Sequence, residues 1–301
     1  MSISVVGIGQ CKIDYFGIVP QYPAVDREVE LMQFSIQGGG HAANTISTLA
    51  RLGNSGSAFI GKLSNDQFGE FLLYGMSSFG VHLDGVILQK ERVSPFSFTI
   101  IDKKTHKRQV FSSRGDIDPL SPQEIPYALL DGIDYLYMDG HFFEAQFEAA
   151  KYAKARKAKI VLQVHDLNDQ METLISLSDY LILSEKYAMG IVACGELDEG
   201  LKKLREKGPS HVVITLADEG CIGIDGEGNI SRSENVAVNV VDTTGAGDIF
   251  AGAFIHGLIQ KWSHTRCMHF ANATAALSCR ELGVWAGIPT LDDILKHTKS
   301  T

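Results

Sequence analysis

The sequence predicts an α/β protein with a three-layer α/β/α core, a mostly parallel sheet and a small additional β-sheet. Short apolar runs alternate along the chain with longer segments of helical periodicity, which is typical of a parallel sheet covered on both faces. Two stretches, 11–39 and 92–115, hold strand-like pieces without helices between them. With 301 residues, 45% of them hydrophobic, the chain can bury one large core and a small appendage.

The predicted core strands are short and mostly aliphatic or aromatic. They are Ser4–Ile8, Ser57–Ile60, Tyr135–Met138, Ile160–Val164, Tyr180–Leu183 and His211–Thr215. The predicted helices between them are Ala42–Leu52, Asp66–Phe79, Glu144–Lys157 and Asp198–Lys207. Glycines follow three of these helices, at Gly53, Gly80 and Gly208, as expected for helix C-termini.

The two helix-free stretches are expected to form a small sheet that projects from the core and covers a site as a lid. Its predicted strands are Phe16–Val19, Glu30–Ile36, Ser97–Ile101 and Arg108–Phe111, in antiparallel pairing. The core then consists of residues 1–10, 40–91 and 116–301. The basic run 103–108 lies between two lid strands and is typical of a solvated turn. Exposed lid strands also favour a homodimer through the lid.

The net charge of −9 argues against a nucleic-acid or anionic-membrane partner, because both require a basic face. No apolar run reaches the ~18 residues that a membrane span needs. The N-terminus lacks the pattern of a signal peptide, so we expect a cytoplasmic protein. Its five scattered cysteines then fit reduced, buried thiols.

The segment Asp242-Thr-Thr-Gly-Ala-Gly-Asp248 is the most informative part of the chain. It follows an apolar, strand-like run, 236–241, and precedes an apolar segment. Glycine N–H groups and a helix N-terminus favour an anion, whereas a carboxylate beside phosphate needs a chemical reason. Accepting a proton from an attacking hydroxyl is such a reason. The structural alternative is an ordinary strand-turn-helix corner with a capping residue.

Three glycines, Gly38, Gly39 and Gly40, open the first core helix and place Asn44 on its first turn. They permit close approach of the backbone to a ligand, or they form a flexible hinge. Asp14 follows the first strand, where an isolated Asp is commonly a turn residue.

Asp242–Asp248 resembles the second signature of the ribokinase-like (PfkB) family of carbohydrate kinases, and Gly39-Gly40 with Asn44 resembles the first. The resemblance covers essentially the whole chain. It implies ATP-dependent phosphorylation of a sugar-like alcohol, with Mg²⁺ on the ATP phosphates. Asp248 would be the general base, the N–H groups of Gly245, Ala246 and Gly247 would bind the phosphoryl group, and sugar hydroxyls would be held by Asp14, Gly39, Gly40 and Asn44.

The resemblance also implies a nucleotide side. Its residues would be Thr215, Ala217, Gly220, Asn272 and Gly283, with Ala217 standing where the family usually has glycine. Asp242 and Thr244 would be ligands of a monovalent cation such as K⁺. The chain has Ser184 and Tyr187 where many members carry Asn-x-x-Glu. Ser184-Glu185, the Ala-Gly-Ile-Pro at 286–289 and the Val-Val-Asp-Thr-Thr at 240–244 make it most similar to the sulfofructose kinase-like and ketohexokinase-like branch.

Polar residues around the lid are candidates for determining which substrate binds. Arg114, after the second lid segment, is either a surface residue or a substrate ligand. His141 and His165 each follow a core strand, where ligands collect in open α/β sheets, although a structural role for either is the simpler interpretation.

Two other functions stay open. A nucleoside kinase of the same fold would need an aromatic pocket, to which Tyr15, Phe16, Phe96 and Phe98 could contribute. The other is a catalytically weak ATP- and sugar-binding protein.

Overall fold

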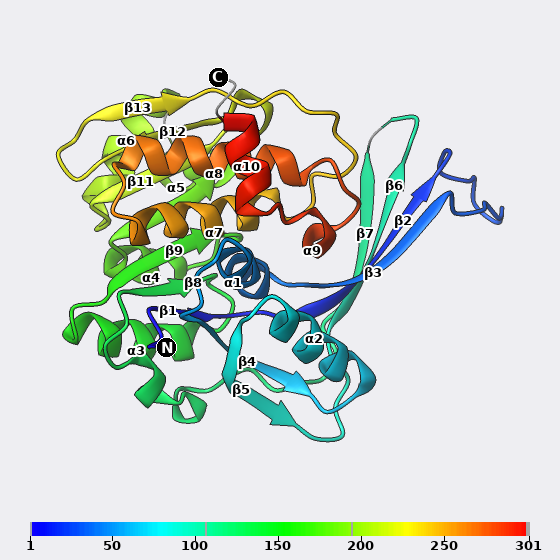
Figure 1. The fold of residues 1–301 in the computed structure, drawn as a ribbon, viewed down its shortest axis with the longest axis horizontal. Coiled ribbons are helices and arrows are strands. Elements are labelled where there is room, and N and C mark those ends of the chain that lie inside the picture. The colour runs from blue at the N-terminus through cyan, green and yellow to red at the C-terminus, as the bar shows by residue number, and fades with distance from the viewer. Residues whose placement is uncertain (1, 106, 194, 299–301) are drawn as a thin grey trace.

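A nine-stranded sheet between two layers of helices forms the core of the computed structural model, which describes residues 2–105, 107–193 and 195–298 (Figure 1). The strand order is β13-β12-β11-β10-β9-β8-β1-β4-β5. The strands are β1 (Val5–Ile8), β4 (Ser57–Ser64), β5 (His82–Gln89), β8 (Tyr135–Met138), β9 (Lys159–Val164), β10 (Tyr180–Ser184), β11 (His211–Thr215), β12 (Cys221–Ile224) and β13 (Ile230–Ser233). Neighbouring strands from β11 through β5 pair in parallel. Among the described core strands, the pairs β11–β12 and β12–β13 are antiparallel, so the sheet is mostly parallel, as predicted.

Helices cover both faces of this sheet because both faces are apolar. Along β1, Val5 packs into one buried cluster, and Val6 and Ile8 pack into the other. The first cluster includes α1 (His41–Arg51), α2 (Gln67–Ser78), α7 (Ala246–Ile259) and α8 (His264–Ser278). The second includes α3 (Phe143–Ala155), α4 (Met171–Leu177), α5 (Glu185–Val192) and α6 (Leu197–Glu206). Two short helices, α9 (Val284–Gly287) and α10 (Leu291–Thr298), close the described chain.

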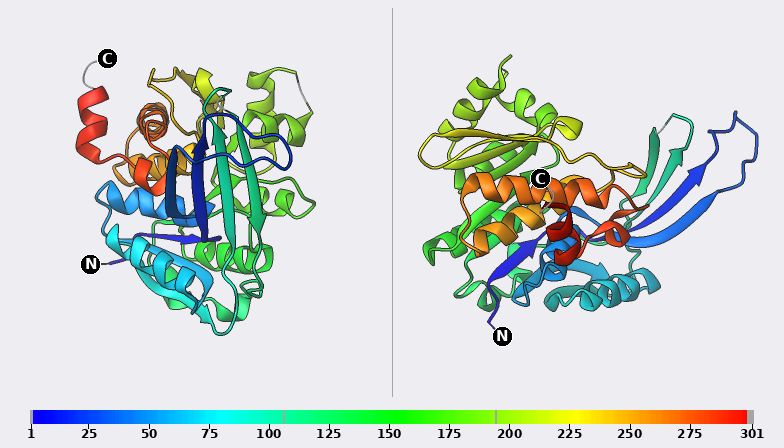
Figure 2. Two further views of the ribbon diagram at one scale, coloured as in Figure 1. Left: turned by 90° about the vertical axis from the view of Figure 1, so that its right-hand side faces the viewer. Right: turned by 45° about the horizontal axis from the view of Figure 1, so that its top comes forward.

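The lid is a second sheet of four strands within the described residues, in the order β3-β2-β6-β7. Its strands are β2 (Lys12–Val19), β3 (Gln33–Gly39), β6 (Phe96–Asp102) and β7 (Arg108–Ser113). They stand beside the core as one projecting layer (Figure 2). The predicted antiparallel pairing is wrong for β2 and β6, which pair in parallel. Both strands leave the core from the same edge of the large sheet, so they run outward in the same direction, while β3 and β7 return.

Two further corrections concern local structure. The run 236–241 is not a strand, because the N–H groups of Val241 and Asp242 donate to the carbonyl of Cys279 after α8, at 2.8 and 3.2 Å, instead of to a sheet partner. Asp14 lies within the lid strand β2 and not in a turn.

Four free thiols, Cys11, Cys221, Cys267 and Cys279, are buried as expected, and Cys194 is outside the described residues. No helix in the described part of the chain is long and apolar enough to cross a membrane.

The indole of Trp285, on α9, joins the base of the lid to the core. A Cβ atom at Gly38 would lie 2.0 Å from Cη2 of the ring, and a Cβ atom at Gly75 on α2 would lie 2.2 Å from Cζ3. The two glycines therefore make the space that the ring fills. The indole Nε1–H donates to Oδ1 of Asn44 at 3.0 Å, so the position of Trp285 also fixes the side chain of Asn44.

We expect Gly38→Ala to lower the free energy of unfolding by about 1–3 kcal/mol, because the added methyl group overpacks against a buried ring. Urea unfolding of the purified variant measures this change. Gly195→Ala is the matched control, since a Cβ atom there meets nothing within 4 Å. Equal stability of the two variants would show that Trp285 moves aside at no cost.

Candidate active site

A cavity of about 270 Å³ opens where the core strands end and where α1 and α7 begin. Ligands collect at this edge in open α/β sheets because loops and helix N-termini converge there. The cavity brings together ten of the residues proposed from sequence as site residues or strand-end candidates. These are Asp14, Gly40, Asn44, His165, Thr215, Thr244, Gly245, Ala246, Gly247 and Asp248.

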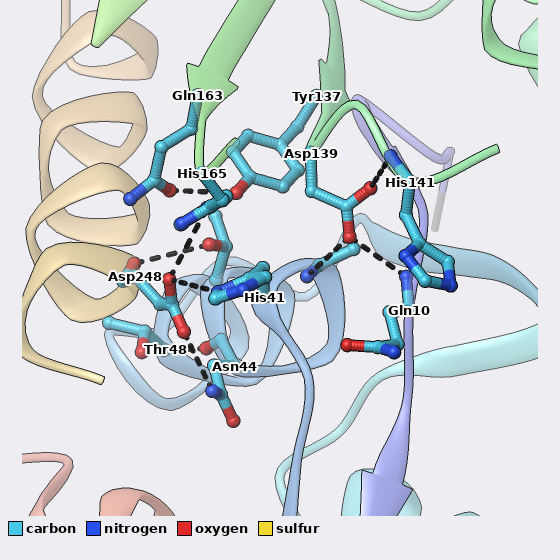
Figure 3. A network of polar contacts seen from close by, with 12 residues as sticks. Gln10, His41, Asn44, Thr48, Tyr137, Asp139, His141, Gln163, His165 and Asp248 are labelled. Carbon is cyan, nitrogen blue, oxygen red and sulfur yellow. Dashed lines mark hydrogen bonds and ion pairs between the residues drawn. The ribbon is translucent and has the colours of Figure 1, made fainter. Parts of the chain in front are cut away.

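Asp248 lies on the first turn of α7, and its carboxylate is buried (Figure 3). Its Oδ1 accepts from Nδ1 of His41 at 3.1 Å, and its Oδ2 accepts from Nδ2 of Asn44 at 2.8 Å. Nε2 of His165 lies 3.6 Å from Oδ1. Burial alone would raise the pKa of Asp248, but the charge and hydrogen bond of His41, with His165 and Asn44, hold this pKa below its usual range. Asp248 is therefore an ionised carboxylate at neutral pH.

The two histidines beside Asp248 stack on each other, with ring centroids 3.4 Å apart and planes 12° apart. Burial opposes a charge on His41, but Asp248 outweighs this effect, and the pKa of His41 is raised. Burial and the nearby His41 lower the pKa of His165 to about 4. Sequence reasoning missed His41 altogether and assigned His165 a structural role. The available signal was the position of His41, three residues before Asn44 on the first turn of α1.

Gly245 turns the chain into α7 with a φ of 73°, a left-handed conformation that favours glycine. A Cβ atom there would lie 2.6 Å from the side chain of Val284. The first N–H groups of a helix lack partners within the helix. The N–H of Ala246 donates to the carbonyl of Thr243 at 3.3 Å, whereas within the described chain no such turn partner exists for the N–H of Gly247.

Asp14 reaches the cavity from the lid. Its buried carboxylate forms an ion pair with Nζ of Lys12 at 3.0 Å and accepts a short hydrogen bond from Oγ of Ser97. A Cβ atom at Gly39 would lie 1.9 Å from Oδ2 of Asp14, so only glycine leaves room for this carboxylate. Gly40, with a φ of 97°, begins α1. The backbone at Gly39 and the carboxylate of Asp14 on the lid therefore pack directly against each other.

Arg114 and His141 lie in a neighbouring cavity of about 520 Å³, which shares Lys12 with the first cavity. Both side chains are exposed. These two residues therefore line the cavity next to the one that holds Asp248, and Lys12 lines both cavities.

The residues assigned to a nucleotide are spread over a wider area, and of these only Thr215 lines the first cavity. Ala217 and Gly220 both have positive φ, 53° and 90°, so Ala217 adopts a conformation that favours glycine. Nδ2 of Asn272 donates to the carbonyl of Glu234 at 2.6 Å, and this bond ties the segment after β13 to α8. Ser184 and Tyr187, which replace the Asn-x-x-Glu pattern, both line the cavity.

Asp242 organises the loop before α7. Its Oδ1 accepts from the N–H and the Oγ1–H of Thr244 at 2.9 and 2.7 Å, and its Oδ2 accepts from the N–H of Gly283 at 3.0 Å. Nη1 of Arg108, on lid strand β7, donates to Oγ1 of Thr244 at 3.0 Å. The lid therefore touches the glycine turn directly.

Asp139, at the end of β8, holds the loops that precede the site (Figure 3). Its buried carboxylate accepts from the N–H groups of Gln10, Ala42 and His141 at 2.8, 3.3 and 3.0 Å. It also accepts from Nε2 of Gln146 at 2.8 Å. This residue fixes the start of α1, and with it His41.

A mostly parallel α/β core, a lid sheet and a buried carboxylate beside a glycine turn define a small-molecule kinase. Residues 2–291 match the pfkB family of carbohydrate kinases, and the chain belongs to this family. It is a phosphotransferase with an alcohol group as acceptor.

The chain is similar to ribokinase of Lactococcus lactis subsp. lactis, with 24% identity over 97% of this chain and 96% of the relative. It is also similar to ketohexokinase of Mus musculus, with 23% identity over 90% of this chain and 94% of the relative. The structure of Arabidopsis thaliana ribokinase complexed with ribose and ATP superimposes with a TM-score of 0.85, at 20% identity over 99% of both chains. This last likeness shows the fold.

We expect Asp139→Asn to lower the free energy of unfolding by about 1–3 kcal/mol, because an amide NH₂ would face donors that now bind a carboxylate. Urea unfolding checks this value. Asp131→Asn serves as the control, since Asp131 is an exposed partner of Arg156, and exposed pairs contribute only about 0–1 kcal/mol. A loss at Asp139 no larger than at Asp131 would contradict the anchoring role.

Proposed function

We propose that the protein transfers the γ-phosphoryl group of ATP to a hydroxyl of a sugar or sugar-like molecule, with Asp248 as general base. The observation that carries this proposal is the position of Asp248, an ionised carboxylate on the cavity wall, on the first turn of a helix that begins with glycine. A carboxylate in this position can accept the proton of a substrate hydroxyl. The helix N-terminus beside it favours a phosphate group.

In the proposed reaction, the substrate oxygen forms a bond to the γ-phosphorus while the bond from that phosphorus to the β,γ-bridging oxygen of ATP breaks. The proton of the hydroxyl passes to Asp248, and ADP leaves. The N–H groups of Gly245 and Gly247, with the helix N-terminus, stabilise the negative charge of the transferring group, and Ala246 contributes if its weak turn bond opens. Asp14, Gly39, Gly40 and Asn44 hold the other hydroxyls.

Mg²⁺ neutralises charge on the ATP phosphates when it is bound. At Ser184 and Tyr187 the chain offers hydroxyl groups where a carboxylate would be the stronger ligand. We infer that this ion is bound mainly by phosphate oxygens and water, as Mg²⁺ commonly is.

A monovalent cation at Asp242 and Thr244 belongs to the same proposal, as does a nucleotide site at Thr215, Ala217, Gly220, Asn272 and Gly283. So does the placement near ketohexokinase-like and sulfofructose kinase-like members.

A sugar is favoured over a nucleoside as substrate because the aromatic and the polar side chains lie on opposite faces of the lid. Side chains alternate along a strand, so Tyr15 points to the face opposite that of Asp14. Tyr15 stacks on Phe98 with ring centroids 4.8 Å apart, so these two rings pack against each other and not against a ligand in the Asp14 cavity. The face that carries Asp14 bears Ser97 beside it, and the amide of Gln37 on the same face is bonded to Leu282 and Ala286. The polar groups suited to hydroxyls there are therefore Asp14 and Ser97.

We further propose that two copies of the chain associate through the outer face of the lid. Ile36, Tyr15, Phe98 and Phe111 lie in register across all four lid strands and form one apolar row. Of these, Ile36, Phe98 and Phe111 are large exposed side chains. An apolar row of this size on a projecting sheet is suited to a second copy of the same row.

Replacing the base tests the function. We expect Asp248→Asn to keep the fold and ATP binding but to lower kcat by about 10²–10⁴-fold, because the amide cannot accept the proton. A coupled ADP assay against a panel of sugars and nucleosides identifies the substrate and then compares the variant with the wild type. ATP binding by calorimetry is the control. Turnover close to that of the wild type would eliminate Asp248 as the base.

The lid association has its own test. We expect Phe111→Arg to yield monomers in analytical ultracentrifugation, because a charge would be buried in the apolar row. Val110→Arg is the control, since Val110 is exposed on the opposite face of the same strand. A monomeric wild-type protein, or dissociation by both variants, would contradict a dimer through the outer face.

A further inference from the structure

Three potential metal ligands meet at the proposed base. They are Nδ1 of His41, Nε2 of His165 and a carboxylate oxygen of Asp248, all within 4.8 Å of one another. They come from three separate elements, the start of α1, the segment after β9 and the first turn of α7. In Figure 3 both imidazole rings lie beside the carboxylate of Asp248.

The nitrogen of His165 is an independent indication of a ligand. Nε2 is buried and has no hydrogen-bond partner within the described part of the chain. Buried polar atoms are usually paired, and an unpaired one calls for an explanation. At 3.6 Å from Oδ1 of Asp248, this nitrogen is too far for a hydrogen bond, but it is close enough for both atoms to bind one ion.

We propose that His41, His165 and Asp248 form a binding site for a transition-metal dication of the Zn²⁺ type, and that the bound ion inhibits the kinase. Two imidazoles with one carboxylate are a common ligand set for Zn²⁺ and its neighbours. Mg²⁺ prefers oxygen ligands, so this site differs chemically from the one that Mg²⁺ takes on ATP. The inhibitory part rests on the proposed function of Asp248, whereas the binding site does not.

The distances allow this coordination after a small movement. A tetrahedral zinc ion with bonds of ~2.0–2.2 Å separates its ligand atoms by roughly 3.3–3.5 Å. The separations of Oδ1 from the two nitrogens, 3.1 and 3.6 Å, are already close to this range. Because the two rings are nearly parallel, one ring must turn for both lone pairs to face a single ion. The cavity of about 270 Å³ beside them leaves space for the ion and a water ligand.

Binding would remove the base from the reaction. A metal ion on Oδ1 of Asp248 takes the lone pair that the hydroxyl proton needs and replaces the bond from His41. Saturating Mg²⁺ would therefore not relieve the inhibition, because Mg²⁺ prefers oxygen ligands and does not compete for the two imidazoles.

Metal binding is measured without nucleotide, on the metal-free full chain. ZnCl₂ is titrated by calorimetry, and CoCl₂ by the visible absorption of tetrahedral Co²⁺. We expect about one ion per chain, and binding at least about tenfold weaker in His165→Gln and in His41→Gln. His297→Gln, on the exposed helix α10, is the control and should bind like the wild type. Equal affinity in the wild type and the His165→Gln variant, or no saturable binding, would overturn the proposal.

Kinase assays with Mg²⁺ and ATP separate the two proposals. We expect Zn²⁺ to inhibit the wild type and to inhibit His165→Gln less, each relative to its own uninhibited rate. A protein that binds Zn²⁺ at the triad but phosphorylates no alcohol contradicts the proposed function alone. A protein that is an active kinase but binds no Zn²⁺ contradicts the metal site alone.

Discussion

The buried carboxylate of Asp248 at the N-terminus of α7 is the constraint on which the rest of the site depends. A carboxylate in an otherwise apolar helix is costly unless it is fully hydrogen-bonded. Asn44 and His41, both on the first turn of α1, supply these bonds. Asn44 is itself fixed by Trp285, whose ring fills the space beside Gly38. The geometry of Asp248, the proposed base, thus depends on Asn44 and Trp285 and through them on the root of the lid.

The large sheet explains why these groups meet. Its parallel strands end at one edge, and the chain leaves that edge through Asp139, His165 and Ser184 before it enters a helix or loop. Asp139 accepts from the N–H of Gln10 in the loop after β1 and from the N–H of Ala42 at the start of α1, and so holds both in place. The apolar contacts of α1, α7 and α8 then fix these three helices against one face of the sheet. Polar anchoring at the edge and apolar packing behind it place His41 and Asp248 within hydrogen-bonding distance.

Sequence reasoning found what depends on local pattern. Each core strand and each glycine segment is a continuous stretch of sequence, so its residues alone indicate what it forms. The fold class follows from the alternation of these strands with helices. The pair of His41 and His165 was missed because their contact depends on how two distant elements converge. The edge strand β5 was not predicted either, because it is half exposed and lacks a continuous apolar run. The parallel pair of β2 and β6 depends on the direction in which both strands leave the core, which no short pattern records.

The lid links the two sides of the cavity. Asp14 on β2 carries a buried carboxylate to the side where a hydroxyl substrate would bind, and Arg108 on β7 reaches Thr244 at the glycine turn. Both strands belong to one hydrogen-bonded sheet, in which β6 lies between them. The groups that would perform the chemistry, in contrast, stand on helices packed into the core. Changes in the lid should therefore leave the position of Asp248, the proposed base, unaltered, because helices packed into the core hold it.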